Sequence, residues 1–147
     1  QDVQTFIQSG NVLFRSDKPD TVKLTNQIEA ALSKTFNYKS RLVLRSQKQL
    51  KAIVAKAPKG FGTDSTKYRY DVIFLKEPLT AAKAMESVKT KEGVDHAFTG
   101  KDVLYFSRLR SRASQSYLAR IIGLPMYQNM TIRNWNTTTK LLALMEA

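Results

Sequence analysis

Two observations on the order and spacing of elements predict an α+β fold made of two related halves. The apolar periodicity of the second half reads strand, helix, strand, strand, helix, strand, helix, and the first half repeats this order without its leading strand and helix. The residues also recur with a period of about 90, because 10–14 resembles 100–105 and 44–46 resembles 132–134. We therefore predict two ferredoxin-like (βαββαβ) subdomains with antiparallel sheets, the N-terminal one lacking its first strand and helix.

The chain opens with a predicted β-hairpin. Residues 3–8 and 12–15 are rich in β-branched and aromatic side chains, and Gly10 accepts the positive φ that a tight hairpin turn requires. The polar residues of the tip, Ser9, Gly10 and Asn11, are candidate ligand contacts. The turn geometry alone also selects Gly and Asn, so a purely structural role is the alternative.

Two helices and one strand are expected in the rest of the first half. Asp20 or Thr21 can cap a helix that runs to about Phe36. The sequence RLVLR at 41–45 predicts a strand, and Ser46 is placed to cap a second helix.

A stretch rich in Gly, Ser and Thr at 58–67 predicts a linker. It separates an incomplete N-terminal subdomain and its following helix, 1–57, from a C-terminal subdomain and a C-terminal helix, 68–147. In the C-terminal part we expect strands at 68–75, 94–98, 103–108 and 129–133, and helices at 78–88, at 115–122 and from 136 or 137 onward.

The predicted topology leaves the N-terminal sheet without an interior strand. In a ferredoxin-like unit the first strand is central, and a sheet that lacks it presents two unpaired backbone edges. Either an N-terminal segment of roughly 30 to 40 residues precedes this chain in the native protein, or another chain supplies the strand. We expect the first.

The composition excludes several kinds of site. The 147 residues contain no Cys, which excludes disulfides, thiolate nucleophiles and Cys-based zinc sites. They contain one His, which excludes any site that needs two imidazoles. The acidic residues are mostly isolated and show no metal-ligand spacing, so we expect no metal and no cofactor. The longest apolar run, 141–145, is far shorter than the ~20 residues of a membrane span. We expect a cytoplasmic protein without a membrane partner.

The charge is strongly positive and unevenly distributed. Lys and Arg number 24 against 12 Asp and Glu, a net charge of +12. No acidic residue occurs in 30–63 or in 103–145, and both stretches are basic. Like charges that lie within a Debye length repel, and an anionic partner relieves the repulsion. These stretches predict binding of nucleic acid or a phosphate-bearing ligand; the alternative is that exposed cations keep the protein soluble.

Three motifs occur in order along the chain: VQTFIQSGNVLF at 3–14, YDVIFL at 70–75 and TIRNWNT at 131–137. Together they resemble the domain of unknown function 1697 family. The resemblance implies a pair of ferredoxin-like subdomains and no established activity. Family members begin earlier, with a further strand and helix that this sequence lacks. This difference agrees with the gap in the predicted topology.

The best candidate for an anion site is the arginine-rich stretch that follows the strand at 103–108. Arg108, Arg110 and Arg112 alternate, so in extended chain they would point the same way and repel each other without a counter-charge. Ser114 lies beside them. The alternative is a solvated edge that discourages pairing between sheets.

A second candidate joins the end of a strand to the start of the last helix. Arg133 carries a fork suited to a carboxylate or phosphate, Asn134 lies at the helix start, and Trp135 could stack on a ligand. In the structural alternative Asn134 or Asn136 caps the helix and Trp135 fills the space between helix and sheet.

No catalytic residue is predicted. His96 follows Asp95, but strand alternation would turn them to opposite faces, and neither a phosphate-binding nor a dinucleotide loop is present. Residues 101–106 also lack the glycine and the aromatic spacing that are typical of RNA-recognition modules. We expect a non-enzymatic binder of an anionic partner; the alternatives are an enzyme with a cleft between the subdomains, or an assembly or regulatory module that uses a sheet edge.

Overall fold

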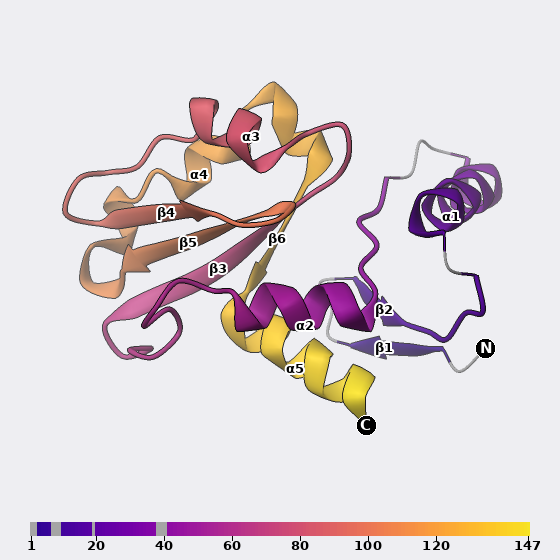
Figure 1. Ribbon diagram of the computed structural model, residues 1–147. Helices are drawn as coiled ribbons and strands as arrows, with labels where there is room; N and C mark the ends of the chain where they lie inside the picture. Colours follow the sequence, from indigo (N-terminus) through magenta and orange to yellow (C-terminus); the bar gives the residue numbers. More distant parts are fainter. Residues whose placement is uncertain (1–2, 7–9, 19, 38–40) are drawn as a thin grey trace.

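The computed structural model describes residues 3–6, 10–18, 20–37 and 41–147 (Figure 1). The strands are β1 (Gln4–Phe6), β2 (Asn11–Leu13), β3 (Tyr68–Leu75), β4 (Asp95–Thr99), β5 (Val103–Leu109) and β6 (Met130–Asn134). The α-helices are α1 (Thr21–Phe36), α2 (Gln47–Ala55), α3 (Ala81–Ser87), α4 (Leu118–Ile121) and α5 (Trp135–Glu146). Among the residues described, the 3₁₀ helices are η1 (Arg110–Gln115) and η2 (Pro125–Asn129). This α+β architecture confirms the predicted fold class.

The second half forms a four-stranded sheet with the order β4-β5-β3-β6. All its pairs are antiparallel, and the first strand of the unit, β3, lies between β5 and β6. This is the strand order of the predicted ferredoxin-like unit. The end of β3 is buried from Asp71 to Leu75 because helices cover both faces of the sheet.

Two apolar cores lie on opposite faces of this sheet. On one face Ile73 and Phe106 pack with Leu118 and Ile121 of α4, beside α3. On the other face the core joins the sheet to α2 and α5, which lie side by side (Figure 1). The Tyr105 hydroxyl donates to the backbone carbonyl of Ile53 at 2.6 Å and ties α2 to the sheet.

The predicted linker at 58–67 is an ordered loop that contributes to the second core. The ring of Phe61 makes edge contacts with Tyr105 and Trp135, with ring centroids 5.4 and 5.1 Å apart. Gly62 has a φ of +83°, and a Cβ added there would lie 2.3 Å from Trp135 Nε1. The division of the chain at 58–67 stays a prediction, because α2, which precedes the loop, packs on the second sheet.

The first half contributes the two-stranded sheet of β1 and β2 and the helix α1. The hairpin is antiparallel, with Thr5 opposite Val12, and Gly10 has the expected positive φ of +82°. Asp20 caps α1 by accepting hydrogen bonds from the amides of Val22 and Lys23. Although α1 has 16 residues, none of them is buried.

Residues 41–45 differ from the prediction, because they are extended but form no strand. A strand needs a neighbour to accept and donate its backbone hydrogen bonds. No strand that the structure describes lies beside this segment. The capping residue that follows, Ser46, behaves as expected and forms a capping box with Gln49.

Three helix positions in the second half also differ from expectation. The helix expected at 78–88 begins at Ala81, because Thr80 supplies the cap. The helix expected at 115–122 is shorter, because only Leu118–Ile121 form α4 and Gln115 is the last residue of η1. The last helix begins at Trp135, since Asn134 accepts from the amide of Thr137 at 2.7 Å.

Gly62 and Gly60 provide a matched test of the packing against Trp135. Both have a φ near +82°, but a Cβ at Gly60 would meet only Thr63 Oγ1 at 3.9 Å. We expect Gly62→Ala to lower the free energy of unfolding by about 1–3 kcal/mol more than Gly60→Ala, because it also overpacks the core. Urea denaturation of the two variants measures the difference. Equal losses would show that Trp135 moves away at no cost.

Candidate functional site

The first predicted anion site lies at the end of β5 and in η1. Arg108 stands opposite Arg69 of β3 and Asp95 of β4 in the sheet register. Its Nε is buried and has no hydrogen-bond partner among the described residues, and the same holds for Asp71 Oδ2 and Asp95 Oδ1. Arg108, which is half-buried, therefore lies in a charged cluster with the buried carboxyls of Asp71 and Asp95 at this end of the sheet.

Burial raises the pKa of the Asp71 carboxyl above its usual range, while the nearby Arg108 and Arg69 oppose the shift. Asp71 is 8% exposed, so the loss of hydration of the ionised form outweighs the attraction of the two arginines.

The neighbouring arginines are exposed, and their hydrogen bonds go to different places. Arg110 Nε donates to the Ser65 carbonyl at 2.6 Å, and Arg112 Nη2 donates to Gln115 Oε1 at 2.8 Å. Ser114 is exposed in the same 3₁₀ turn. The alternation expected of an extended chain does not apply after Leu109, because the backbone turns into η1 there.

An aromatic side chain that the sequence analysis did not single out lies close to this turn. The Arg120 guanidinium lies 3.6 Å from the ring centroid of Tyr117, and Lys91 Nζ lies 5.9 Å from it. Asp95 Oδ2 accepts hydrogen bonds from the amides of both Lys91 and Tyr117, at 2.9 and 2.8 Å, and so joins their two loops. An ideal Cβ on Gly93 would lie 3.6 Å from Arg112 Nη1, so Arg112 borders the same loops.

We refer to these exposed or half-exposed side chains together as the basic patch: Lys91, Arg110, Arg112, Tyr117 and Arg120. None of its four cations forms an ion pair with a residue that the structure describes. A sequence signal existed in the basic and aromatic residues of 117–120, but only the fold brings them next to Lys91.

The second predicted site joins residues far apart in the sequence. Arg133 Nε donates to Asn11 Oδ1 at 2.8 Å, and its Nη1 donates to the Ile132 carbonyl at 2.9 Å. Arg133 is half-buried, and burial lowers its pKa from the usual value. The structure thus brings Arg133 to the hairpin tip, where Gly10 and Asn11 were also predicted as ligand contacts.

The other residues predicted at these two places have structural contacts. Asn134 caps α5, and Trp135 packs against Phe61 and Gly62. Ser9 lies outside the described residues.

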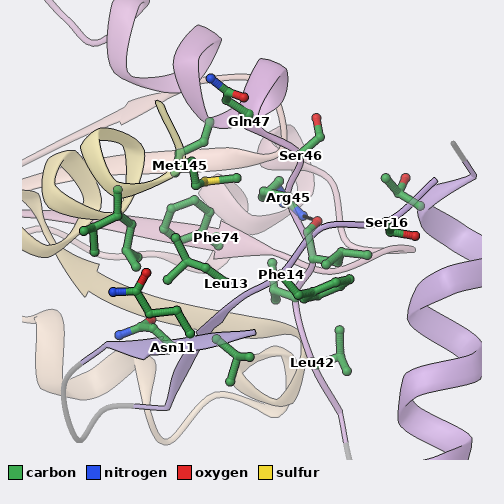
Figure 2. A pocket seen from close by; sticks show the side chains of 18 of the residues that line it. Asn11, Leu13, Phe14, Ser16, Leu42, Arg45, Ser46, Gln47, Phe74 and Met145 are labelled. Atoms are coloured by element: carbon green, nitrogen blue, oxygen red, sulfur yellow. Dashed lines mark hydrogen bonds between the residues drawn. The ribbon is translucent and has the colours of Figure 1, made fainter. Parts of the chain in front are cut away.

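A cleft of about 1060 Å³ opens beside β2. Figure 2 shows Leu13 near Phe74 and Met145, and Phe14 between Arg45 and Leu42; all of them line the cleft. The cleft is lined by the carboxylate of Glu146 and by five cationic side chains: Arg15, Lys18, Arg41, Arg45 and Arg133.

Arg45 connects the two halves of the molecule at this cleft. Its Nη2 donates to the backbone carbonyls of Leu75 at 2.7 Å and Asp102 at 3.0 Å, and its guanidinium lies 5.8 Å from the ring centroid of Phe74. Burial lowers its pKa, while Asp102 and Glu77 oppose the shift.

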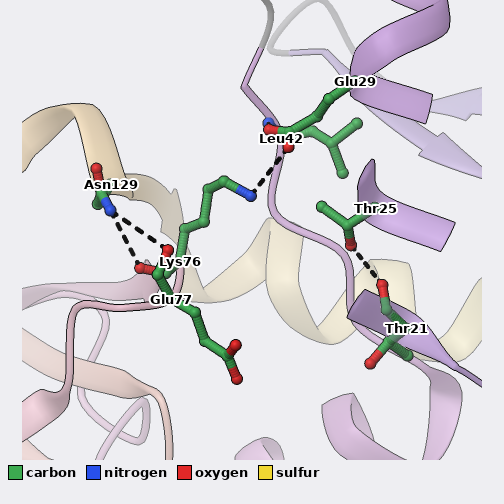
Figure 3. Close-up of polar contacts among 7 residues, drawn as sticks. All are labelled: Thr21, Thr25, Glu29, Leu42, Lys76, Glu77 and Asn129. Atoms are coloured by element: carbon green, nitrogen blue, oxygen red, sulfur yellow. Dashed lines mark hydrogen bonds and ion pairs between the residues drawn. The ribbon is translucent and has the colours of Figure 1, made fainter. Parts of the chain in front are cut away.

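Glu29 of α1 supplies a second connection (Figure 3). One carboxylate oxygen accepts from Lys76 Nζ at 3.2 Å, and the other accepts from the amide of Leu42 at 2.8 Å. The single carboxylate therefore holds α1 against both the extended segment and the end of β3.

Within the ranges that the structure describes, no group of three His, Asp or Glu side chains is placed to hold a metal ion. None of the helices described is long and apolar enough to cross a membrane.

The family of proteins of unknown function DUF1697 matches residues 1–105. The chain belongs to this family. A solved structure of a conserved bacterial protein from Streptococcus pneumoniae is similar in fold, with a TM-score of 0.84 and 22% sequence identity. The match covers 100% of this chain and 82% of the streptococcal one. No curated protein matches the chain.

The buried position of Asp71 predicts a pH dependence of stability. Its folded-state pKa lies above the unfolded value of about 3.9, so its contribution to stability is fully present below that pH and is lost as the pH rises through the folded pKa. We expect Asp71→Asn, which cannot titrate, to lose less stability than the native chain between pH 4 and neutrality.

Urea unfolding at several pH values tests this expectation. Glu92→Gln, which neutralises an exposed carboxylate instead, is the control and should keep the native profile. An unchanged pH profile in Asp71→Asn would show that Asp71 does not cause the loss of stability with rising pH.

Proposed function

We propose that this family member is a non-enzymatic binder of an anionic, phosphate-bearing partner, and that the partner contacts the basic patch. The observation that carries the proposal is the arrangement around Tyr117, whose ring lies beside Arg120 and Lys91 while Arg112 borders the same loops. Cations held on an aromatic ring lose less side-chain freedom when they bind, because the ring already restricts them.

The local charge balance supports an anionic partner. Asp95, the buried carboxylate beneath the patch, accepts two backbone amide hydrogen bonds and so fixes the loops. No acidic residue lies between 103 and 145 in the sequence, and the net charge of +12 attracts anions over a longer range.

Between the two kinds of phosphate-bearing partner, these observations favour nucleic acid. The four cations of the patch come from three places in the chain: the loop before β4, η1 and α4. A strand with successive phosphates can contact several of them at once, whereas a single phosphate contacts one or two.

A labelled single-stranded oligonucleotide tests the proposal by fluorescence anisotropy. Each phosphate that the protein neutralises contributes about 0.7 to the slope of log K against log salt. The double variant Arg112→Ala with Arg120→Ala removes two cations of the basic patch and should therefore reduce the slope by about 1.4. The matched control is Lys48→Ala with Lys51→Ala, which removes two exposed cations of α2 and the same net charge.

The control pair should keep the native slope. Equal weakening in both double variants would show that net charge alone attracts the oligonucleotide, and affinity that does not change with salt would contradict the proposal. Displacement of the oligonucleotide by millimolar inorganic phosphate would indicate a small phosphorylated ligand instead.

A further inference from the structure

The Arg120 guanidinium is stacked on the ring of Tyr117. Its central carbon lies 3.6 Å from the ring centroid, whereas the other cation–aromatic contacts described span 5.5 to 5.9 Å. At 3.6 Å the two flat groups lie face to face, because an edge-on approach would press the N–H groups into the ring. Arg120 is exposed, and its guanidinium forms no ion pair or hydrogen bond with a residue that the structure describes. The second face of the guanidinium is therefore open to a ligand.

The fold holds this stack in place. Tyr117 and Arg120 are three residues apart, so both side chains lie on the same side of the α4 turn. The residues beside them, Leu118 and Ile121, are buried in the core. The Tyr117 amide donates to the buried carboxylate of Asp95 at 2.8 Å, and the Arg120 amide donates to the Tyr117 carbonyl at 3.0 Å. The stack is therefore formed before a ligand arrives, which lowers the entropic cost of binding.

Helices cover both faces of the four-stranded sheet. α3 and α4 lie on one face, and α2 and α5 lie on the other. Two aromatic side chains of the central strand β5, Tyr105 and Phe106, are only 1% and 0% exposed. RNA-recognition modules stack bases on aromatic residues of an open sheet face, and β5 offers no such face here. The stack on α4 lies outside the sheet and is accessible.

The open face of the Arg120 guanidinium matches the chemistry of an unpaired nucleobase. Bases that are splayed out of a helix stack on aromatic rings and on guanidinium planes. In a duplex each base is already covered by its neighbours, so a single strand presents the face that the stack can bind. The other cations of the basic patch then remain for the phosphates that flank the base.

We propose that the basic patch recognises single-stranded nucleic acid by stacking one unpaired base on the Arg120 guanidinium, which the ring of Tyr117 supports. This inference rests on the proposed function, because it narrows the partner of the same patch. Sequence preference should be weak, since every base has a π-face. Charge alone would favour a duplex, which carries about twice as many phosphates along its length. A preference for the single strand therefore separates stacking from charge.

Fluorescence anisotropy with three forms of one labelled oligonucleotide tests the proposal. The forms are the single strand, the same strand annealed to its complement, and a strand of equal length in which abasic sites replace the bases. We expect the single strand to bind about tenfold more tightly than the abasic strand, which is the size of effect expected from stacking one base. It should also bind more tightly than the duplex. The abasic strand keeps every phosphate, so it measures the contribution of charge alone.

Two variants that conserve charge provide the matched comparison. Arg120→Lys keeps the positive charge but removes the flat guanidinium, so it should bind the single strand and the abasic strand equally and keep the native salt dependence. Arg112→Lys makes the same exchange at an exposed arginine whose guanidinium donates to Gln115. It should keep the native preference for the single strand.

The outcomes distinguish this inference from the proposed function. Salt-dependent binding with equal affinity for the three forms, or tighter binding of the duplex, would overturn the inference and leave an anionic partner supported. A preference for the single strand that persists in Arg120→Lys would also overturn it, since the base would then stack elsewhere. If none of the forms binds in a salt-dependent way, both proposals are wrong.

Discussion

A reciprocal pair of arginine contacts joins the two halves of the molecule. Arg45 of the first half donates to the carbonyl of Asp102 in the second, and Arg133 of the second half donates to Asn11 Oδ1 in the first. In the internal repeat Arg45 corresponds to Arg133, and Asn11 corresponds to Asp102. A guanidinium suits the task because its several donors can reach backbone and side-chain oxygens together.

This packing explains why the helices α2 and α5 are shared between the halves. Each follows the arginine segment of its own half, and the two lie side by side against the second sheet (Figure 1). The second half is complete as a ferredoxin-like unit, with α3 and α4 on one face of its sheet, while α2 and α5 cover the other face. The first half has the hairpin, α1 and the extended segment, and the cleft between them is lined by backbone edges and apolar side chains as well as by arginines. The cations at this cleft are therefore weaker evidence for an anionic ligand than those of the basic patch.

The sequence predicted the fold class, the hairpin and the cap of α2 because each depends on local residues or on a repeated pattern. The prediction of a strand at 41–45 was wrong. The residue pattern of this segment is typical of a strand, but a strand also needs a neighbouring strand to pair with. The alternation of Arg110 and Arg112 does not place their side chains on one face, because the chain turns into η1 there. The residues near Tyr117 in the sequence also gave no indication that Lys91 would lie beside its ring. Contacts between loops distant in sequence follow from the sheet register, which composition and spacing do not determine.

The reciprocal arginine contacts can be tested by a distance measurement, because the chain contains no Cys and accepts labels at chosen positions. Spin labels at Lys23→Cys on α1 and His96→Cys on β4, both exposed, report on the relative placement of the halves. With both native arginines, pulsed electron paramagnetic resonance should give one narrow distance distribution, and Arg45→Ala with Arg133→Ala should broaden it. A distribution that is already broad with the native arginines, or that the double variant leaves unchanged, would contradict the account.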